Sequence, residues 1–230
     1  ITYIIKNEWK GFVTKIEYIK HITNNYNLND NDILLFIDAY DVLINSNLEE
    51  IINKFISLNC NILFSAEVNA WPKHLKQQMK SIYTYTDTDN KYLNSGGYIG
   101  YVKYIKNCVN SVSDDELIQK CKSKLPSCDQ TFFTLYFIDN YKKLNIKLDT
   151  KSEIFQSMFL ILWNKFEFRN GRVYNHILNK YPCFIHFNGY SFKTNKKENI
   201  MPIFIKKMIN SQNSNLNDYK QNISKHYNPY

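Results

Sequence analysis

Two aspartates at the end of an early apolar run could hold a divalent cation. Residues 33–37 are apolar and predict a buried, parallel strand, so Asp38 and Asp41 would lie in the turn after its carboxyl end. In open α/β sheets, ligands bind at that edge. Carboxylate oxygens at this spacing suit Mn²⁺ or Mg²⁺, and such an ion can hold a diphosphate and offset the charge on a leaving phosphate. On spacing alone, turn-forming or helix-capping aspartates explain such a pair more often.

One histidine late in the chain could complete this metal site. His186 lies in the apolar run 183–187, which predicts a strand, and Asn188 and Gly189 follow as a turn whose backbone could approach a phosphate. An imidazole beside two carboxylates would give three protein ligands and leave positions for diphosphate oxygens. Considered alone, a histidine in an apolar strand is more often a hydrogen-bonded core residue.

The glycines are concentrated near the same positions. Of the six glycines, three lie between residues 96 and 100 and a fourth is Gly189. The sequence Asn94-Ser95-Gly96-Gly97 stands just before an expected strand over 98–102, which predicts either a positive φ or the close approach of a ligand. An ordinary loop is the alternative. The GxxxxGK[ST] pattern is absent and no GxGxxG follows a strand, which excludes P-loop nucleoside triphosphatases and Rossmann oxidoreductases.

Further side chains could bind a sugar or a phosphate. Glu67 ends an expected strand, Trp71 follows it closely, and Asp129 opens an expected helix. The two carboxylates could accept hydrogen bonds from sugar hydroxyls, and the indole offers a flat face for stacking. Lys15 and Lys193 could balance phosphate charge. Taken singly, these residues fit a solvated Glu67, a core Trp71, a helix cap at Asp129 and surface lysines.

The elements that must position these residues alternate between strand and helix. Asn47 followed by Glu50 resembles a capping box, and the helix after it should bury one apolar face, made of Leu48, Ile51, Ile52, Phe55 and Ile56. The other expected elements are helices over 16–26 and 129–137 and strands over 33–37, 61–66, 98–102 and 183–187. This alternation predicts an α/β domain with a mainly parallel or mixed sheet flanked by helices.

Composition indicates one folded domain. The chain has 230 residues, of which 44% are apolar and 16% aromatic, unlike a disordered chain. No apolar stretch is long enough to span a membrane. Residues 1–209 are expected to form the domain and 210–230 a polar tail.

The five scattered cysteines indicate neither a disulfide scaffold nor a zinc site, and leave open one bridge from Cys121 to Cys108 or Cys128.

The net charge and the first residues of the chain give little information about binding partners and localisation. The net charge of +8 favours anionic partners, but heavy use of Lys, Asn and Ile suggests a genome poor in G and C, which weakens a nucleic-acid interpretation. We therefore expect no nucleic-acid partner. No charged-then-apolar signal segment opens the chain, so the sequence leaves its localisation open.

Taken together, the segments resemble the glycosyltransferase domain of the multifunctional procollagen lysyl hydroxylase/glucosyltransferase family, including relatives in giant DNA viruses. The resemblance runs in the family's order from about residue 9 to about residue 195. The matching segments are 36–42, 63–67, 71–72, 92–100, 129–134, 148–149, 154–156, 162–167 and 185–189.

The resemblance implies a GT-A-like fold that uses a UDP-sugar and Mn²⁺, and that passes glucose to hydroxylysine or galactosyl-hydroxylysine of a collagen-like polypeptide with retention of configuration. It assigns the metal to Asp38, Asp41 and His186. It assigns the donor nucleotide and diphosphate to Lys15, Tyr40, Asn188, Gly189 and Lys193, with Tyr40 against the uridine, and the sugar and acceptor pocket to Glu67, Trp71, Asn94 and Asp129. It also suggests a homodimer, and the endoplasmic reticulum lumen or, for a viral relative, a host cell or virion.

The sequence departs from the family pattern at several points. The family's aspartate run before a glutamine is represented by Ser127-Cys128-Asp129-Gln130, with Asp114-Asp115 displaced upstream. After His186, Phe187 replaces a glycine, Tyr190 replaces a proline and Lys193 aligns with a one-residue shift. The chain also begins beyond the family's first strand.

These departures keep alternatives open. One is a hydroxylysine galactosyltransferase that uses UDP-galactose. Another is a module derived from such an enzyme that binds collagen or nucleotide without catalysis. A carboxylate–metal nuclease would suit the positive charge, but the tryptophan and glycine placements have no role in two-metal phosphodiester chemistry.

Overall fold

The computed structural model describes residues 9, 11–82, 86, 88–113, 128–189, 191–193, 196–198 and 201–211. Asp114-Asp115, Cys121 and residues 212–230 of the expected tail lie outside the described residues. The described elements are α1 (Val13–Asn25), β1 (Ile33–Ile37), β2 (Val42–Ile44), α2 (Leu48–Ser57), β3 (Ile62–Glu67), η1 (Lys73–Leu75), α3 (Lys76–Ile82), β4 (Tyr92–Tyr101), α4 (Val102–Val109), α6 (Cys128–Asn140), β5 (Ile146–Leu148), β6 (Phe155–Ser157), η2 (Trp163–Lys165), β7 (Phe166–Arg169), β8 (Arg172–Asn175), β9 (Phe184–His186), β10 (Ser191–Lys193), β11 (Lys196–Glu198) and α7 (Met201–Ser211).

The strands form two central sheets and two hairpins. The larger sheet has the order β1-β4-β3-β5, in which β4 runs antiparallel to both neighbours and β5 runs parallel to β3. The smaller sheet has the order β2-β9-β6, with β9 antiparallel to β2 and parallel to β6. The prediction of an α/β fold with a mixed sheet flanked by helices is confirmed.

The prediction of a buried parallel strand over 33–37 is wrong in both respects. The strand exists with those bounds as β1, but it pairs with β4 in the antiparallel sense, and its residues are half-buried. An apolar run shows that a strand contacts the core, and it does not show how many neighbours the strand has. Among the described strands, β1 lies at the edge of the larger sheet and has β4 as its one partner.

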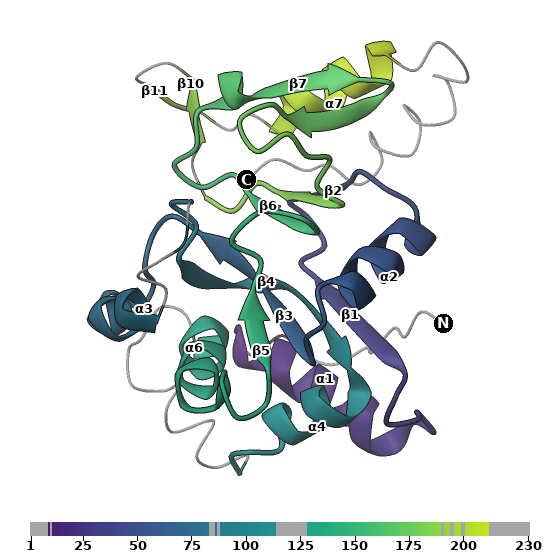
Figure 1. The fold of residues 1–230 in the computed structure, drawn as a ribbon, viewed down its shortest axis with the longest axis vertical. Helices are drawn as coiled ribbons and strands as arrows, with labels where there is room; N and C mark the ends of the chain where they lie inside the picture. The colour runs from purple at the N-terminus through teal and green to yellow at the C-terminus, as the bar shows by residue number, and fades with distance from the viewer. Residues whose placement is uncertain are drawn as a thin grey trace.

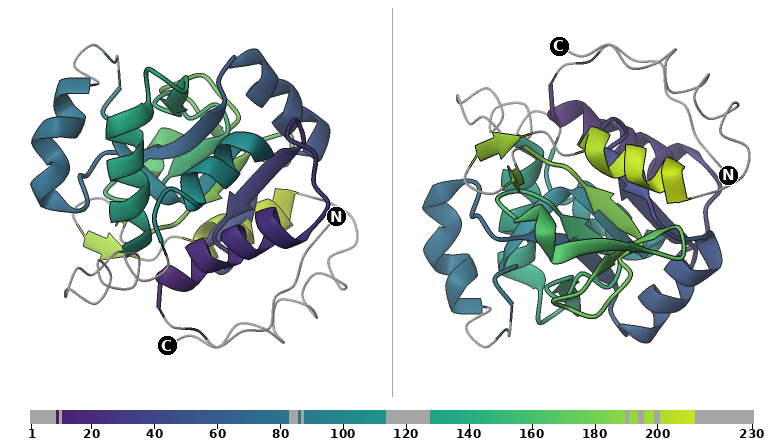
Figure 2. Two further views of the ribbon diagram at one scale, coloured as in Figure 1. Left: turned by 90° about the horizontal axis from the view of Figure 1, so that it is seen from below. Right: turned by 90° about the horizontal axis from the view of Figure 1, so that it is seen from above.

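The larger sheet buries side chains on both faces. In β3, Ile62 and Phe64 face one core cluster, whereas Leu63 between them faces another. This alternation follows from the two-residue period of a strand. Helices α1, α4 and α6 cover the first face, as Figure 2 shows from below, and α2 packs with β6 and β9 against the second. The helices therefore leave the strand ends, and not the faces, open to ligands.

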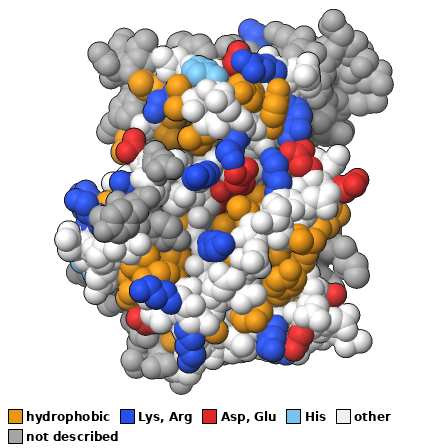
Figure 3. Space-filling view, viewed as in Figure 1, with side chains coloured by type: hydrophobic (Ala, Val, Ile, Leu, Met, Phe, Trp, Pro, Cys, Tyr) orange, Lys and Arg blue, Asp and Glu red, His pale blue; other side chains and the backbone are white. Residues whose placement is uncertain are grey.

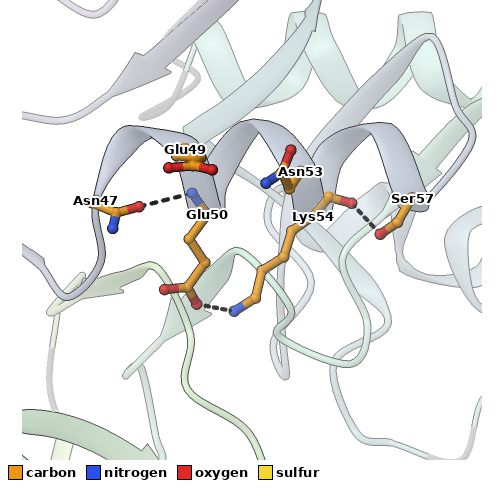
Figure 4. Close-up of a pocket in the computed structure, with 6 residues that line it drawn as sticks. All are labelled: Asn47, Glu49, Glu50, Asn53, Lys54 and Ser57. Atoms are coloured by element: carbon orange, nitrogen blue, oxygen red, sulfur yellow. Dashed lines mark hydrogen bonds and ion pairs between the residues drawn. The ribbon is translucent and has the colours of Figure 1, made fainter.

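Helix α2 begins after Asn47, which caps it as the sequence predicts, while the Glu50 carboxylate pairs with Lys54 and Arg172 instead of completing a capping box. The side chain of Asn47 accepts a hydrogen bond from the backbone N–H of Glu50 at 2.8 Å (Figure 4), a cap that contributes about 1 kcal/mol. The buried face is narrower than expected, because only Ile51 and Phe55 are buried. Of the five residues expected on that face, Leu48 is 65% exposed and Ile56 is 54% exposed.

Buried polar side chains tie the upper part of the molecule in Figure 1 to the region around α2. Asn45 donates to the carbonyls of Val173 and Pro182 and accepts from the backbone N–H of Val173. Arg172 donates to the carbonyl of Asn45 and pairs with Glu50 at 2.9 Å. These bonds fix the β7–β8 hairpin beside the sheet β2-β9-β6.

Strand β4 is longer than the sequence predicts. It begins at Tyr92, so Asn94-Ser95-Gly96-Gly97 lies inside the strand and not in a loop before it. Neither Gly96 nor Gly97 has a positive φ. Instead, a Cβ at Gly96 would lie 2.1 Å from the His186 ring, and one at Gly97 would lie 2.8 Å from the Phe155 ring. Both positions therefore require glycine because another side chain of this protein, His186 or Phe155, packs directly against the backbone there.

The hydropathy of the helices, the surface charge and the state of the cysteines bear on the possible partners of the protein. No described helix combines the length and the apolar character that crossing a bilayer would require. On the face drawn in Figure 3, Lys and Arg side chains are scattered among uncharged residues and mixed with carboxylates, so that face carries no continuous basic surface. The described thiols of Cys60, Cys108 and Cys183 are free and buried.

Candidate functional site

Asp38, Asp41 and His186 lie together at the junction of the two central sheets. One potential ligand atom from each residue lies within 4.8 Å of the others. Nε2 of His186 is 3.4 Å from Oδ1 of Asp41 and 3.8 Å from Oδ2 of Asp38. Asp38 directly follows β1 and Asp41 directly precedes β2, while His186 ends β9 opposite Val42 of β2. The turn that carries both aspartates therefore leads the chain from one sheet into the other.

The surroundings of His186 fit a divalent cation. The imidazole is 5% exposed, and its Nδ1 lies 3.2 Å from the side-chain oxygen of Asn94. An Nδ1–H that donates to Asn94 leaves the Nε2 lone pair directed toward the two carboxylates. Nε2 has no hydrogen-bond partner among the described residues. One nitrogen and two carboxylate oxygens form a donor set that suits Mn²⁺ or Mg²⁺.

Gly96 makes this arrangement possible. Its carbonyl accepts a hydrogen bond from the backbone N–H of Asp38 at 2.9 Å. A Cβ there would lie 2.1 Å from Cε1 of His186 and 2.9 Å from Oδ2 of Asp38. Any side chain at this position would therefore displace two of the three candidate ligands.

Charges around the cluster favour an ionised aspartate. Burial raises the pKa of Asp41, but the His186 ring, whose Nε2 lies 3.4 Å away, and the charge of Lys15 together outweigh burial, so the pKa falls below its usual value. Nζ of Lys15, from α1, lies 2.5 Å from Oδ1 of Asp38 and 3.6 Å from Oδ2 of Asp129. Burial raises the pKa of Asp129, although Lys15 opposes that shift. A single ammonium group thus bridges two carboxylates at the edge of the cluster.

A pocket of about 360 Å³ adjoins the cluster and contains most of the side chains expected at the site. The expected residues that line it are Lys15, Asp38, Asp41, Glu67, Trp71, Asn94, Asp129, His186, Asn188 and Gly189. Tyr40 is 93% exposed and is not among the described lining residues. The side chain of Lys193 lies outside the described part of the structure, so its expected role stays a prediction.

The pocket also contains residues that the sequence did not single out for a role. They are Phe12, Asn69, Ser95, Gly96, Gln130 and Phe159. Ser95, Gly96 and Gln130 lie inside segments that carry the family resemblance, and the placement of the glycines had also drawn attention to the segment with Ser95 and Gly96. Phe12, Asn69 and Phe159 stand in no motif or periodic pattern.

A network of amides holds Glu67 in place. Gln130 donates to Oε1 of Glu67 at 2.8 Å and to the carbonyl of Trp71 at 3.2 Å, and Asn188 donates to Oε2 of Glu67 at 3.0 Å. Burial raises the pKa of Glu67 to about 7, although these hydrogen bonds lower it. The pocket therefore presents an oriented carboxyl group, which can exchange hydrogen bonds with a hydroxyl-bearing ligand.

Two other hollows lack comparable chemistry. One of about 470 Å³ lies along α2 (Figure 4), where Lys54 pairs with Glu50 and donates to the carbonyls of Glu153 and Tyr181. The other, of about 510 Å³, is lined by lysines, amides and apolar side chains, with Asp89 as its one carboxylate and no imidazole among its described lining residues. The pocket beside His186 is the best candidate for a catalytic site.

Fold and site together define an α/β protein with a candidate carboxylate–imidazole cation site where its two central sheets meet, beside a polar pocket with aromatic walls. The family model of the PLOD GT domain matches residues 6–214. The chain belongs to this glycosyltransferase-domain family, and the resemblance seen in the sequence is confirmed.

Curated relatives agree with this assignment. The human multifunctional procollagen lysine hydroxylase and glycosyltransferase LH3 is 31% identical over 181 residues, which cover 76% of this chain and 23% of that protein. Procollagen-lysine,2-oxoglutarate 5-dioxygenase 1 of Gallus gallus is 30% identical over 80% of this chain and 26% of its own length. An uncharacterized protein of Acanthamoeba polyphaga mimivirus is 32% identical over 84% of this chain and 39% of its length. The chain thus spans about a quarter of its animal relatives.

Similar solved structures are also glycosyltransferases. Mouse xyloside xylosyltransferase 1 overlays with a TM-score of 0.45 and 14% identity, over 76% of this chain and 63% of that one. The WbbM bifunctional glycosyltransferase overlays with a TM-score of 0.44 and 14% identity, over 86% of this chain and 35% of that one. The family assignment rests on the sequence matches.

Proposed function

We propose that this chain is a Mn²⁺-dependent retaining glycosyltransferase that moves glucose from UDP-glucose to hydroxylysine or galactosyl-hydroxylysine of a collagen-like polypeptide. The observation that carries the proposal is the convergence of Asp38, Asp41 and His186 beside a pocket lined by carboxylates and amides. Membership in the PLOD GT domain family supplies the class of reaction.

In this proposal Asp38, Asp41 and His186 hold the cation. Mn²⁺, when bound, supplies positive charge that offsets the charge on the leaving diphosphate. Lys15 supports the same task, because its ammonium group lies between Asp38 and Asp129, where a phosphate oxygen can replace one of its carboxylate partners. Tyr40, Gly189 and Lys193 would complete the nucleotide site.

The remaining pocket residues orient the sugar and the acceptor. Glu67 and Asp129 can accept hydrogen bonds from hydroxyl groups, and the amides of Asn94 and Asn188 can donate or accept them. Trp71 offers an apolar face for a sugar ring. Because transfer with retention needs no inverting general base, positioning and charge stabilisation would carry the rate.

Mass spectrometry of acceptor peptides tests the proposal directly. The full chain is incubated with Mn²⁺ and either UDP-glucose or UDP-galactose, and with peptides that carry hydroxylysine or galactosyl-hydroxylysine. We expect addition of one hexose from UDP-glucose, and none in EDTA. Transfer from UDP-galactose alone would indicate the galactosyltransferase. UDP binding without transfer or hydrolysis would indicate a binding module, and full activity in EDTA would contradict the mechanism.

Asp41→Ala is the variant that addresses the cation directly. We expect kcat/KM for UDP-glucose transfer to fall roughly 100-fold or more, because a bound ion supplies several kcal/mol of transition-state stabilisation. Asp139→Ala removes an exposed aspartate on α6 and serves as the matched control. Circular dichroism of both variants should match the parent protein. Equal activities of the two variants would show that Asp41 does not bind the ion.

A further inference from the structure

Phe159 is a half-buried aromatic residue that lines the pocket beside His186. We propose that its ring is an apolar platform, in addition to Trp71, against which the hexose of the donor packs, an inference that rests on the proposed function and adds a specificity-determining residue to it. Three features of the structure support this role: the way the backbone of Phe159 is held, the surface under its ring and the polar groups beside it.

The backbone of Phe159 is tied to the polar network of the pocket. Its N–H donates to the hydroxyl of Ser157, the last residue of β6, at 3.4 Å. The same hydroxyl donates to the side-chain oxygen of Asn188 at 2.9 Å, and Asn188 donates to Glu67 at 3.0 Å. The backbone of Phe159 is thus linked to Glu67 through two intermediate side chains.

The ring of Phe159 packs on a glycine. A Cβ on Gly189 would lie 2.8 Å from Cδ2 and 3.0 Å from Cε2 of the ring, and Gly189 has a φ of +73°. A side chain at position 189 would therefore push the ring away and would also strain the backbone. The absence of a Cβ lets the ring lie directly on the turn that contains Asn188. This support limits the movement of the ring toward the protein.

The chemistry around the ring matches a hexose. A pyranose presents C–H groups on its faces and hydroxyls around its edge, so it needs an apolar surface flanked by hydrogen-bonding groups. Phe159 supplies such a surface, and Asn188 and Glu67 supply the polar groups. A uracil ring or the alkyl chain of an acceptor lysine would use the aromatic surface with little need for the carboxyl group. The hexose is therefore the ligand that uses both features.

Calorimetry with UDP and with UDP-sugars separates these ligands. In Mn²⁺, Phe159→Ala and Phe159→Leu should weaken UDP-glucose binding by about 3- to 10-fold, the effect of losing one aromatic contact, and should leave UDP binding within about twofold. Phe159→Tyr keeps the ring and should bind both ligands within about twofold of the parent. The ratio of UDP-glucose to UDP-galactose affinity should also change in the alanine and leucine variants, because the two sugars present different C–H faces.

Several outcomes would overturn the inference. Equal losses for UDP and UDP-glucose would place the ring against the nucleotide, and an increase in peptide KM alone would place it against the acceptor. Unchanged UDP-glucose affinity in Phe159→Leu, which retains apolar contact with Gly189, would also refute it. If the parent protein binds UDP-glucose and transfers the sugar while these variants behave normally, only this inference fails. If the parent protein binds no UDP-sugar in Mn²⁺, the proposed function fails with it.

Discussion

The imidazole of His186 is held by three different kinds of contact. Asn94 binds one ring nitrogen, Gly96 leaves room for the ring edge, and the pairing of β9 with β2 brings the residue beside Asp41. Each contact restricts the direction of the free nitrogen. Ligand orientation of this kind raises metal affinity, because less conformational entropy is lost on binding.

The residue types alone indicated part of this site. Aspartates after a strand and a histidine in an apolar strand are recognisable candidates, because few other side chains bind hard cations. Gln130 and Phe159 could not be assigned a role in the same way. Gln130 donates a hydrogen bond to the carboxyl group of Glu67, and Phe159 lies against Gly189, so the roles proposed for both depend on neighbours that are distant in sequence.

Glu67 should make the stability of the metal-free protein depend on pH. Its pKa is raised to about 7 from 4.5, chiefly by burial, so the folded state holds this proton more tightly than the unfolded chain. Its contribution to stability is therefore complete below the unfolded pKa and is lost as the pH rises through about 7. Glu67→Gln cannot ionise, and a flip of the Asn188 amide can satisfy the new side chain. Compared with the parent protein, the variant should gain up to about 3 kcal/mol of relative stability between about pH 5 and pH 8.

Urea unfolding in EDTA at both pH values measures this effect. Glu49→Gln, at an exposed position on α2, is the control and should follow the parent protein. If the parent protein and Glu67→Gln lose stability in parallel as the pH rises, the carboxyl group does not titrate in this range.

At the scale of elements, the sequence predicts strand cores better than strand ends. The apolar runs located β1, β3 and β9 to within one or two residues. The start of β4 was misplaced, because Asn-Ser-Gly-Gly is typical of loops. Pairing with β3 on one side and β1 on the other incorporates this segment into the sheet, with a register shift between Phe64 and Ser65. Local propensity is overridden there by tertiary contacts that also build the site.

The two adjacent glycines of β4 provide a matched pair of variants. A Cβ at Gly96 would collide with His186 and approach Asp38, whereas one at Gly97 would collide with the Phe155 ring at 2.8 Å. Both substitutions overpack the core and should each cost about 1–3 kcal/mol of stability. Only Gly96→Ala should also weaken Mn²⁺ binding, by about 10- to 100-fold, because it displaces a ligand.

Metal titration by calorimetry and urea unfolding separate the two effects. If Gly97→Ala loses as much Mn²⁺ affinity as Gly96→Ala, the loss results from destabilisation of β4 as a whole. Displacement of His186 would then not be its cause. Unchanged affinity in Gly96→Ala would show that His186 is not a ligand.

The whole molecule places its candidate site where the two central sheets meet. Asp38 directly follows β1 of the larger sheet, whereas Asp41 directly precedes β2 and His186 ends β9 of the smaller sheet. The sequence indicated the class of fold but not this arrangement, because strand order depends on contacts between distant segments. Figure 1 shows β2 and β6 between the larger sheet and the β7–β8 hairpin. Because the three candidate ligands lie at strand ends of both sheets, a bound ion would link the two sheets.

An ion that links two sheets should stabilise the molecule as a whole. At a Mn²⁺ concentration of about 100 times Kd, binding to the folded state alone adds about 2.7 kcal/mol, which corresponds to an increase in Tm of roughly 5–10 °C for a chain of this size. Differential scanning calorimetry should show this increase for the parent protein and for Asp139→Ala, but not for Asp41→Ala. A shift that persists in Asp41→Ala would mean that Mn²⁺ binds elsewhere, and no shift in the parent protein would mean that the three side chains do not form a cation site.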